Sequence, residues 1–251
     1  MNQYFKQRHT VRSFDNTKPV SIALIHSIIR DAMQAPTTGN IQLYSIIIST
    51  DEEQKAKLRE AHFNQPASNA PILITFCADI NRFEKWCENR DTVPGFRNLQ
   101  SLLSSILDVT IVAQQFNTIA EINDLGCCYL GTTTYNPEII SEALNLPQMV
   151  IPIITLSVGY PDETEASKGA TERLPLEAVI HDETYKDYDK ERINMLYQEK
   201  ENLEENKAFV KENAKDNLAQ VFNEVRYPKT NNEIFSKKFY DFIVSKGIVL
   251  P

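Results

Sequence analysis

One long segment with few charges, residues 99–122, constrains the fold of this chain more than any other feature. Its scarcity of charge predicts a long helix that is buried on most sides, either in the centre of a domain or at a contact between subunits. The glycine at position 126, shortly after this segment, predicts a left-handed cap at the helix end.

Apolar runs predict strands on both sides of that helix. The clearest run covers residues 72–78 and is apolar throughout, which is typical of a fully buried strand. Further strands are expected at 44–50 and 150–160, and helices at 22–35, 51–62 and 137–145. These elements do not alternate as regular βαβ units, and no G-x-G-x-x-G follows a strand. A Rossmann dinucleotide site therefore has no support.

The composition changes near residue 161, where a polar and charged stretch begins that extends to about residue 215. Helical patterns at 189–200 and 201–213 predict a solvated helical region, and an amphipathic helix returns at 235–250. We expect one domain over residues 1–251, with a core at 1–175 and a charged helical C-terminal arm at 176–251.

Charge, the length of apolar runs, the N-terminal residues and the cysteines argue against several classes of protein. A net charge of −8 without a basic stripe makes nucleic acid an improbable partner. No apolar run reaches the roughly 20 residues that span a bilayer. No secretory signal is visible, so we expect a cytoplasmic protein. The four cysteines lack C-x-x-C spacing and the four histidines are scattered, so we expect reduced structural thiols and no metal.

Three separated segments carry candidate binding residues. Residues 8–14 place two arginines around a threonine, and guanidinium forks suit phosphate oxygens. Residues 35–42 form a loop rich in hydroxyl and amide groups. Residues 125–131 end in a glycine where a backbone can approach a flat ring. Taken alone, the first segment is more typical of an exposed basic terminus and the second of an ordinary turn. The information lies in the order and spacing of all three.

That order, together with Gln65 before Ala70-Pro71 and with Asp108, resembles the nitroreductase superfamily of flavoproteins over about residues 4–175. The likeness is greatest to the branch of oxygen-insensitive NAD(P)H nitroreductases and flavin reductases. It implies an α+β fold with a central mixed, mainly antiparallel sheet flanked by helices. It also implies a homodimer, with a C-terminal segment that wraps the partner subunit.

The resemblance implies a site for FMN, residue by residue. Arg8, Thr10 and Arg12 match residues that hold the phosphate and reach the pyrimidine end of the ring, and His9 lies among them. Thr37, Thr38 and Asn40, with Gln42 beside them, match a loop that contacts the flavin of the neighbouring subunit. Gln65 matches a ribityl or ring contact, Tyr129, Leu130 and Gly131 match the backbone near flavin N5, and Arg173 matches a phosphate arginine.

Two positions depart from the family pattern. Close relatives have a basic residue two positions before that arginine, where this chain has Thr171, and Lys168 is our candidate substitute. Relatives also carry a C-terminal arginine associated with NADPH or substrate, and Ser236-Lys237 lie in that vicinity here. The choice between NADPH and NADH therefore stays open.

The activity implied is hydride transfer from NAD(P)H through bound FMN to nitroaromatics, quinones or flavins by a ping-pong mechanism, without a catalytic side chain. A small aromatic or quinone-like substrate is expected. Alternatives are a flavin reductase with FMN as diffusing substrate, a different reaction on the same fold, a flavin-binding protein without turnover, and an unrelated α+β domain.

Overall fold

The computed structural model describes residues 2–166 and 168–250, which form two compact units. The first unit comprises Met1–Gly169 and Phe235–Pro251, and the second comprises Ala170–Ile234. The expectation of a single domain with an arm from residue 176 stays a prediction, and these units begin and end at other residues.

The first unit contains a four-stranded sheet in the order β1-β2-β4-β3. The strands are β1 (Tyr44–Ser49), β2 (Ile72–Asp79), β3 (Gly126–Tyr129) and β4 (Val150–Gly159). Every neighbouring pair of these strands is antiparallel, and a parallel pairing occurs only as an isolated bridge between Asn98 and Val249 in the described residues. Every residue of β2 is buried, as its unbroken apolar run predicted.

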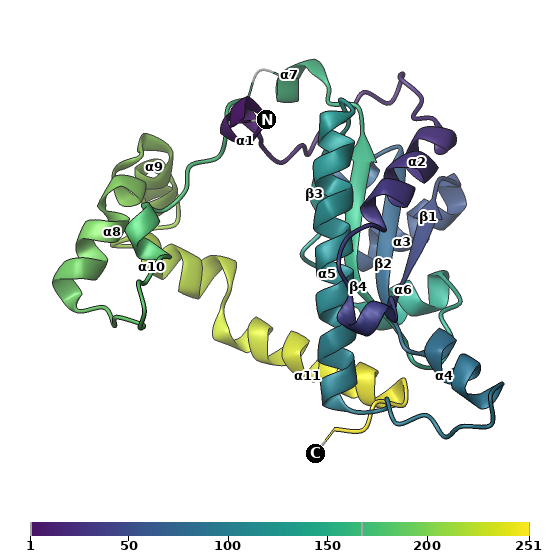
Figure 1. Cartoon of the computed structure of the whole chain (residues 1–251). Helices are drawn as coiled ribbons and strands as arrows, with labels where there is room; N and C mark the ends of the chain where they lie inside the picture. The colour runs from purple at the N-terminus through teal and green to yellow at the C-terminus, as the bar shows by residue number, and fades with distance from the viewer. Residues whose placement is uncertain (1, 167, 251) are drawn as a thin grey trace. The chain divides into compact units, whose positions relative to one another are not determined.

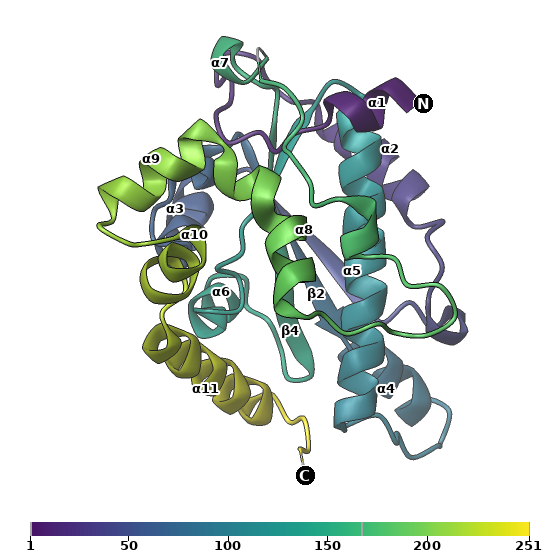
Figure 2. The same cartoon turned by 90° about the vertical axis from the view of Figure 1, so that its left-hand side faces the viewer.

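Helices cover both faces of this sheet. The helices of the first unit are α1 (Asn2–Gln7), α2 (Ile22–Ala32), α3 (Glu52–Ala61), α4 (Asn81–Glu88), α5 (Leu99–Ile122), α6 (Pro137–Ala143), α7 (Glu163–Ala166), and the 3₁₀ turns η1 (Thr38–Asn40) and η2 (Pro66–Asn69). Apolar residues of α2 and α5 pack with Ile74 and Phe76 on one face. Residues of α3 and α6 pack with Leu73 and Cys128 on the other, so the sheet lies between two helical layers (Figures 1 and 2).

The long helix α5 turns one stripe to the sheet and leaves another exposed. Its start is capped by Asn98, whose side chain accepts a hydrogen bond from the Ser101 amide at 3.0 Å. Val109, Val112 and Phe116 lie on the buried stripe. The exposed stripe is also apolar, and its members follow helical spacing. They are Leu99, Leu103, Leu107, Ile111 and Ile122.

The prediction that Gly126 caps this helix in a left-handed conformation is wrong. Asp124 takes the left-handed conformation, with φ at 63°, and Gly126 is the first residue of β3. A glycine is needed at 126 for packing, because a Cβ there would lie 2.6 Å from the Val11 side chain. The N-terminal segment thus reaches the sheet through the space that this glycine leaves.

The second unit is helical and highly charged. It contains η3 (Leu176–Ala178), α8 (Lys190–Asn202), α9 (Glu204–Glu212), α10 (Leu218–Gln220) and a short π-helix, η4 (Val221–Arg226). The helix α11 (Lys229–Ser245) begins in this unit and ends in the first. The second unit has three buried apolar side chains among its described residues, Leu196, Leu218 and Val221. In the described part of the chain, no helix is both long enough and apolar enough to cross a membrane.

Candidate active site

The basic N-terminal segment lies along β3 at the edge of the sheet. The Val11 amide donates to the Cys127 carbonyl at 3.1 Å, and Val11 itself is buried. Further along, Phe14 forms a bridge with Pro161, and the Asp15 amide donates to the Tyr160 carbonyl at 2.9 Å. These backbone contacts fix the positions from which Arg8, Thr10 and Arg12 project.

Arg8 is held by a carboxylate of α5. Its Nε and Nη2 atoms lie 3.3 and 3.2 Å from the carboxylate oxygens of Glu121, whose side chain is only 9% exposed. The Tyr4 hydroxyl donates to the same carboxylate. Burial, and then this hydrogen bond to Glu121, raise the pKa of Tyr4. Arg8 is therefore part of a fixed structural pair as well as a candidate ligand residue.

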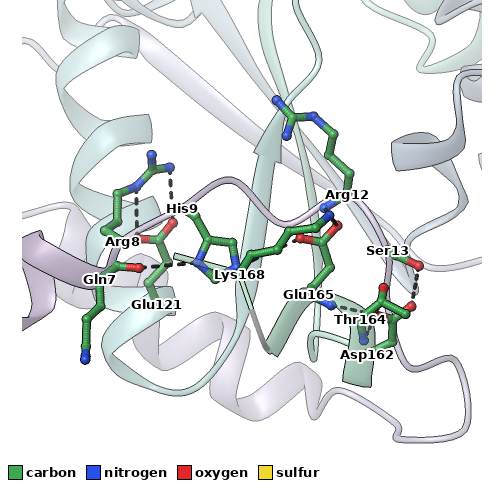
Figure 3. A network of polar contacts seen from close by, with 10 residues as sticks. All are labelled: Gln7, Arg8, His9, Arg12, Ser13, Glu121, Asp162, Thr164, Glu165 and Lys168. Carbon is green, nitrogen blue, oxygen red and sulfur yellow. Dashed lines mark hydrogen bonds and ion pairs between the residues drawn. The ribbon is translucent and has the colours of Figure 1, made fainter. Parts of the chain in front are cut away.

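A second carboxylate, that of Glu165 in α7, lies beside the segment that carries His9 and Arg12 (Figure 3). Its Oε1 accepts from the Arg12 backbone amide at 3.2 Å and from Lys168 Nζ at 2.8 Å. Its Oε2 lies 3.9 Å from His9 Nε2. The structure thus brings the Arg12 backbone amide, Lys168 and His9 to one carboxylate. That Lys168 substitutes for the missing basic residue stays a prediction.

The Arg12 guanidinium differs from that of Arg8. Its side chain is exposed and has no ion pair or hydrogen bond within residues 2–166 and 168–250. Only its backbone amide is engaged. The guanidinium is therefore a free cation beside the sheet edge, available to an anion from outside the chain.

The loop after β3 begins with a buried residue and continues with an exposed glycine. The Leu130 amide donates to the Thr155 carbonyl at 2.9 Å, and Leu130 is buried. Gly131 follows with an exposed backbone, and a Cβ built on it would meet nothing within 4 Å. Its φ is not positive, so its backbone conformation does not require glycine.

Thr132 links this loop to the end of α3. Its hydroxyl is hydrogen-bonded to His62 Nδ1 at 2.8 Å and accepts from Gln65 Nε2 at 3.0 Å. His62 is completely buried, and burial lowers its pKa from 6.5 to about 4. Gln65 was predicted from the sequence, but His62 and Thr132 were missed. A turn with Phe63 and Asn64 in left-handed conformations carries both partners of Thr132.

We expect His62 to make the protein less stable in mild acid. Because its pKa is lower in the folded chain, the unfolded chain takes up the proton first as the pH falls. Neutral His62 therefore contributes about 3 kcal/mol to the free energy of unfolding. This contribution is fully present above about pH 6.5 and is lost as the pH falls from about 6.5 to about 4. The free energy of unfolding, measured with urea across this pH range, should fall with decreasing pH in the native protein and lose this dependence in His62→Gln. The exposed His26→Gln serves as control, and an unchanged slope in His62→Gln would contradict the assignment.

The loop with Thr37, Thr38, Asn40 and Gln42 is held by a different part of α5. Asp108 is buried and accepts from the Thr38 amide at 2.8 Å and from the Leu43 amide at 3.1 Å. Asn40 and Gln42 have φ values of 57° and 58°, which residues with a side chain adopt rarely. Backbone strain of this kind marks a loop whose shape is imposed by its surroundings.

Within the first unit, two groups of predicted site residues are held at separate points of α5. Asp108 and Glu121, which hold the 37–42 loop and Arg8, are about 20 Å apart along α5 at 1.5 Å per residue. Arg173 lies in the second unit, where its guanidinium donates to the carbonyls of Thr171 and Glu172 at 3.1 and 3.0 Å. No three His, Cys, Asp or Glu side chains of the described residues are grouped to hold a metal ion.

Known proteins share this fold and this arrangement of segments. The model of the nitroreductase family matches residues 5–160. An FMN reductase [NAD(P)H] of Bacillus subtilis (strain 168) is 34% identical over 195 residues, which cover 75% of this chain and 77% of the relative. The chain belongs to the nitroreductase family.

Two solved structures extend the likeness to the whole chain. A Bacteroides fragilis NCTC 9343 protein, provisionally described as an oxidoreductase, is 46% identical and superposes with a TM-score of 0.95 over 99% of this chain and 100% of its own. The NfrA1 nitroreductase of B. subtilis is 25% identical, with a TM-score of 0.82 over 98% of each chain. The family and the α+β fold class predicted from the sequence are confirmed, and an NAD(P)H-dependent oxidoreductase activity is supported.

Proposed function

We propose that this chain is an FMN-dependent NAD(P)H oxidoreductase that reduces nitroaromatics, quinones or flavins. One observation carries the proposal. The pairing of Val11 with Cys127 places the basic segment on the strand whose following loop presents the open backbone of Gly131. The basic residues that could bind a phosphate and the exposed backbone on which a ring could stack therefore lie along one edge of the sheet.

The residues present fit FMN. Neither packing nor backbone conformation requires a glycine at 131, and the open space at its Cβ position is what a ring stacked on the backbone would need. The unpaired Arg12 guanidinium, together with Lys168 and His9, which contact the carboxylate bonded to the Arg12 amide, matches a phosphate in charge and donor number. Arg12 and Lys168 would hold the phosphate, and Gln65 with the Leu130–Gly131 backbone would orient the ring.

Bound FMN would supply the two-electron chemistry between the nicotinamide and the acceptor. The chain contributes binding, orientation and charge. A guanidinium near the pyrimidine edge would oppose negative charge there, as Arg8 or Arg12 can. The Thr132 hydroxyl, fixed by His62 and Gln65, holds the loop that faces the ring.

An absorption spectrum of the purified protein tests the proposal. We expect a yellow protein, or a colourless one that turns yellow with added FMN, that NADPH or NADH bleaches without oxygen. Retention of flavin through gel filtration distinguishes a bound cofactor from a diffusing substrate. Binding without bleaching would indicate a flavin-binding protein without turnover. A protein that binds no FMN would refute the proposal.

We further propose a homodimer with a flavin between the subunits and with the C-terminal segment wrapping the partner. Two features support it. The exposed face of α5 carries an apolar stripe from Leu99 to Ile111, and apolar surfaces of this kind mark contacts between proteins. The loop with Thr37, Thr38 and Asn40 is about 20 Å along α5 from the residue that holds Arg8, so these groups would meet across two chains.

Substitution of Leu107 tests the dimer. Leu107 is 60% exposed near the middle of this apolar face. A lysine there would enter a two-fold interface from both subunits, so we expect the dimer dissociation constant to rise at least about 100-fold, with loss of flavin. Sedimentation equilibrium measures it, and Val93→Lys, at an apolar loop residue that is 91% exposed, is the control. A native protein that sediments as a monomer would contradict the proposal.

The cytoplasm is the compartment we propose. All four cysteines are free, and Cys77, Cys127 and Cys128 are buried. Burial raises the pKa of each of these three thiols, which keeps them protonated and unreactive. Such thiols suit a reducing compartment in which NAD(P)H is available.

A further inference from the structure

Glu165 lies where the flavin phosphate is expected, and it contacts the same groups. Its side chain is only 2% exposed, although it belongs to a short helix at the surface. It is bonded to the Arg12 amide and to Lys168, and it faces His9. These residues are the ones to which the proposed function assigns the phosphate.

We propose that Glu165 is an internal counter-ion that competes with the phosphate of FMN and so sets the selectivity of this site between FMN and riboflavin. The inference rests on the proposed function and deepens it. It concerns the ligand class that the site prefers, a flavin with or without its phosphate group.

The donors that hold Glu165 cannot serve a phosphate fully at the same time. The Arg12 amide has a single hydrogen, which points to Glu165 Oε1 at 3.2 Å. A phosphate that takes this hydrogen must displace the carboxylate. A phosphate that binds beside the carboxylate instead places about two negative charges next to a third, and like charges at such distances repel. Both routes lower the affinity for FMN.

The carboxylate is held unevenly, which favours displacement. Its Oε1 has two donors, whereas its buried Oε2 has no hydrogen-bond partner in the described residues, and His9 Nε2 is 3.9 Å away. A buried oxygen without a partner costs free energy. The phosphate offers more acceptor oxygens to the same amide, ammonium and imidazole, and the exposed Arg12 guanidinium adds a donor that Glu165 does not use.

Riboflavin provides the comparison because it has the same ring and ribityl chain without the phosphate. Glu165 has no charge to oppose in riboflavin. Its removal should therefore strengthen the binding of FMN and leave that of riboflavin unchanged.

The test measures dissociation constants of FMN and riboflavin by quenching of flavin fluorescence, for the native protein and for Glu165→Gln. We expect FMN to bind about tenfold more tightly to the variant, and riboflavin to change by less than about twofold. Glu163→Gln, in the same helix but exposed, is the matched control for the change in net charge and should alter neither value by more than about twofold.

Each outcome decides between the two proposals. If Glu165→Gln binds FMN equally or more weakly, the carboxylate supports the site, and the inference is overturned while the proposed function stands. If the native protein and both variants bind neither flavin, the proposed function fails. Glu165→Ala replaces Glu165→Gln if circular dichroism shows the latter to be unfolded, and the same change in the ratio of FMN to riboflavin affinity is required of it.

Discussion

Replacement of Arg12 by alanine is expected to weaken FMN binding by about 10- to 100-fold without destabilising the protein. A charge-assisted hydrogen bond between a guanidinium and a phosphate contributes about 1.5–3 kcal/mol, which corresponds to this factor. The fold does not depend on the side chain, because only the Arg12 backbone amide is bonded among the described residues.

The measurement is a fluorescence titration of flavin-free protein with FMN, together with a thermal melt. Arg30→Ala is the matched control, since Arg30 is an exposed arginine on α2. The contrast with Arg8 is informative. Alanine at position 8 would leave Glu121 buried without its cation, so that variant should lose stability as well as affinity. If Arg12→Ala retained FMN with native affinity, Arg12 would not be a phosphate ligand.

Helices and strands whose pattern of apolar residues lies within one stretch of the chain could be predicted from the sequence. The scarcity of charge in α5 and the unbroken apolar run of β2 both reflect burial by the rest of the fold, and both elements were predicted close to their observed bounds. The basic residues 8–12 were singled out because guanidinium chemistry suits phosphate. Their role remains a prediction.

Contacts between distant parts of the chain were not readable. Gly126 follows a helix, so local rules assign it a cap, whereas the space it provides is filled by Val11 from the N-terminal segment. Glu121 and Glu165 were missed because a lone acid in a helix is ordinary, and nothing local indicates which cation it will meet. His62 was missed for the same reason, since its partner Thr132 is 70 positions away.

An added side chain should have different effects at Gly126 and Gly131, the two glycines at this edge of the sheet. It should lower the melting temperature at the first and the FMN affinity at the second. Alanine at 126 would place its Cβ 2.6 Å from Val11 in a packed interior. Overpacking of this kind costs about 1–3 kcal/mol, so we expect Gly126→Ala to melt several degrees lower. The loss follows from packing alone.

Valine at 131 should leave the melting temperature within about 2 °C, because nothing lies within 4 Å of the added Cβ and φ is not positive. If the flavin ring stacks on this backbone, the same side chain occupies the position of the ring, and FMN affinity should fall at least about 100-fold, or about 2.7 kcal/mol. Gly95→Val is the matched control, since a Cβ on Gly95 also meets nothing within 4 Å. Native FMN affinity in Gly131→Val would place the ring elsewhere, whereas a fall in Gly95→Val as well would show that the loss is not specific to this loop.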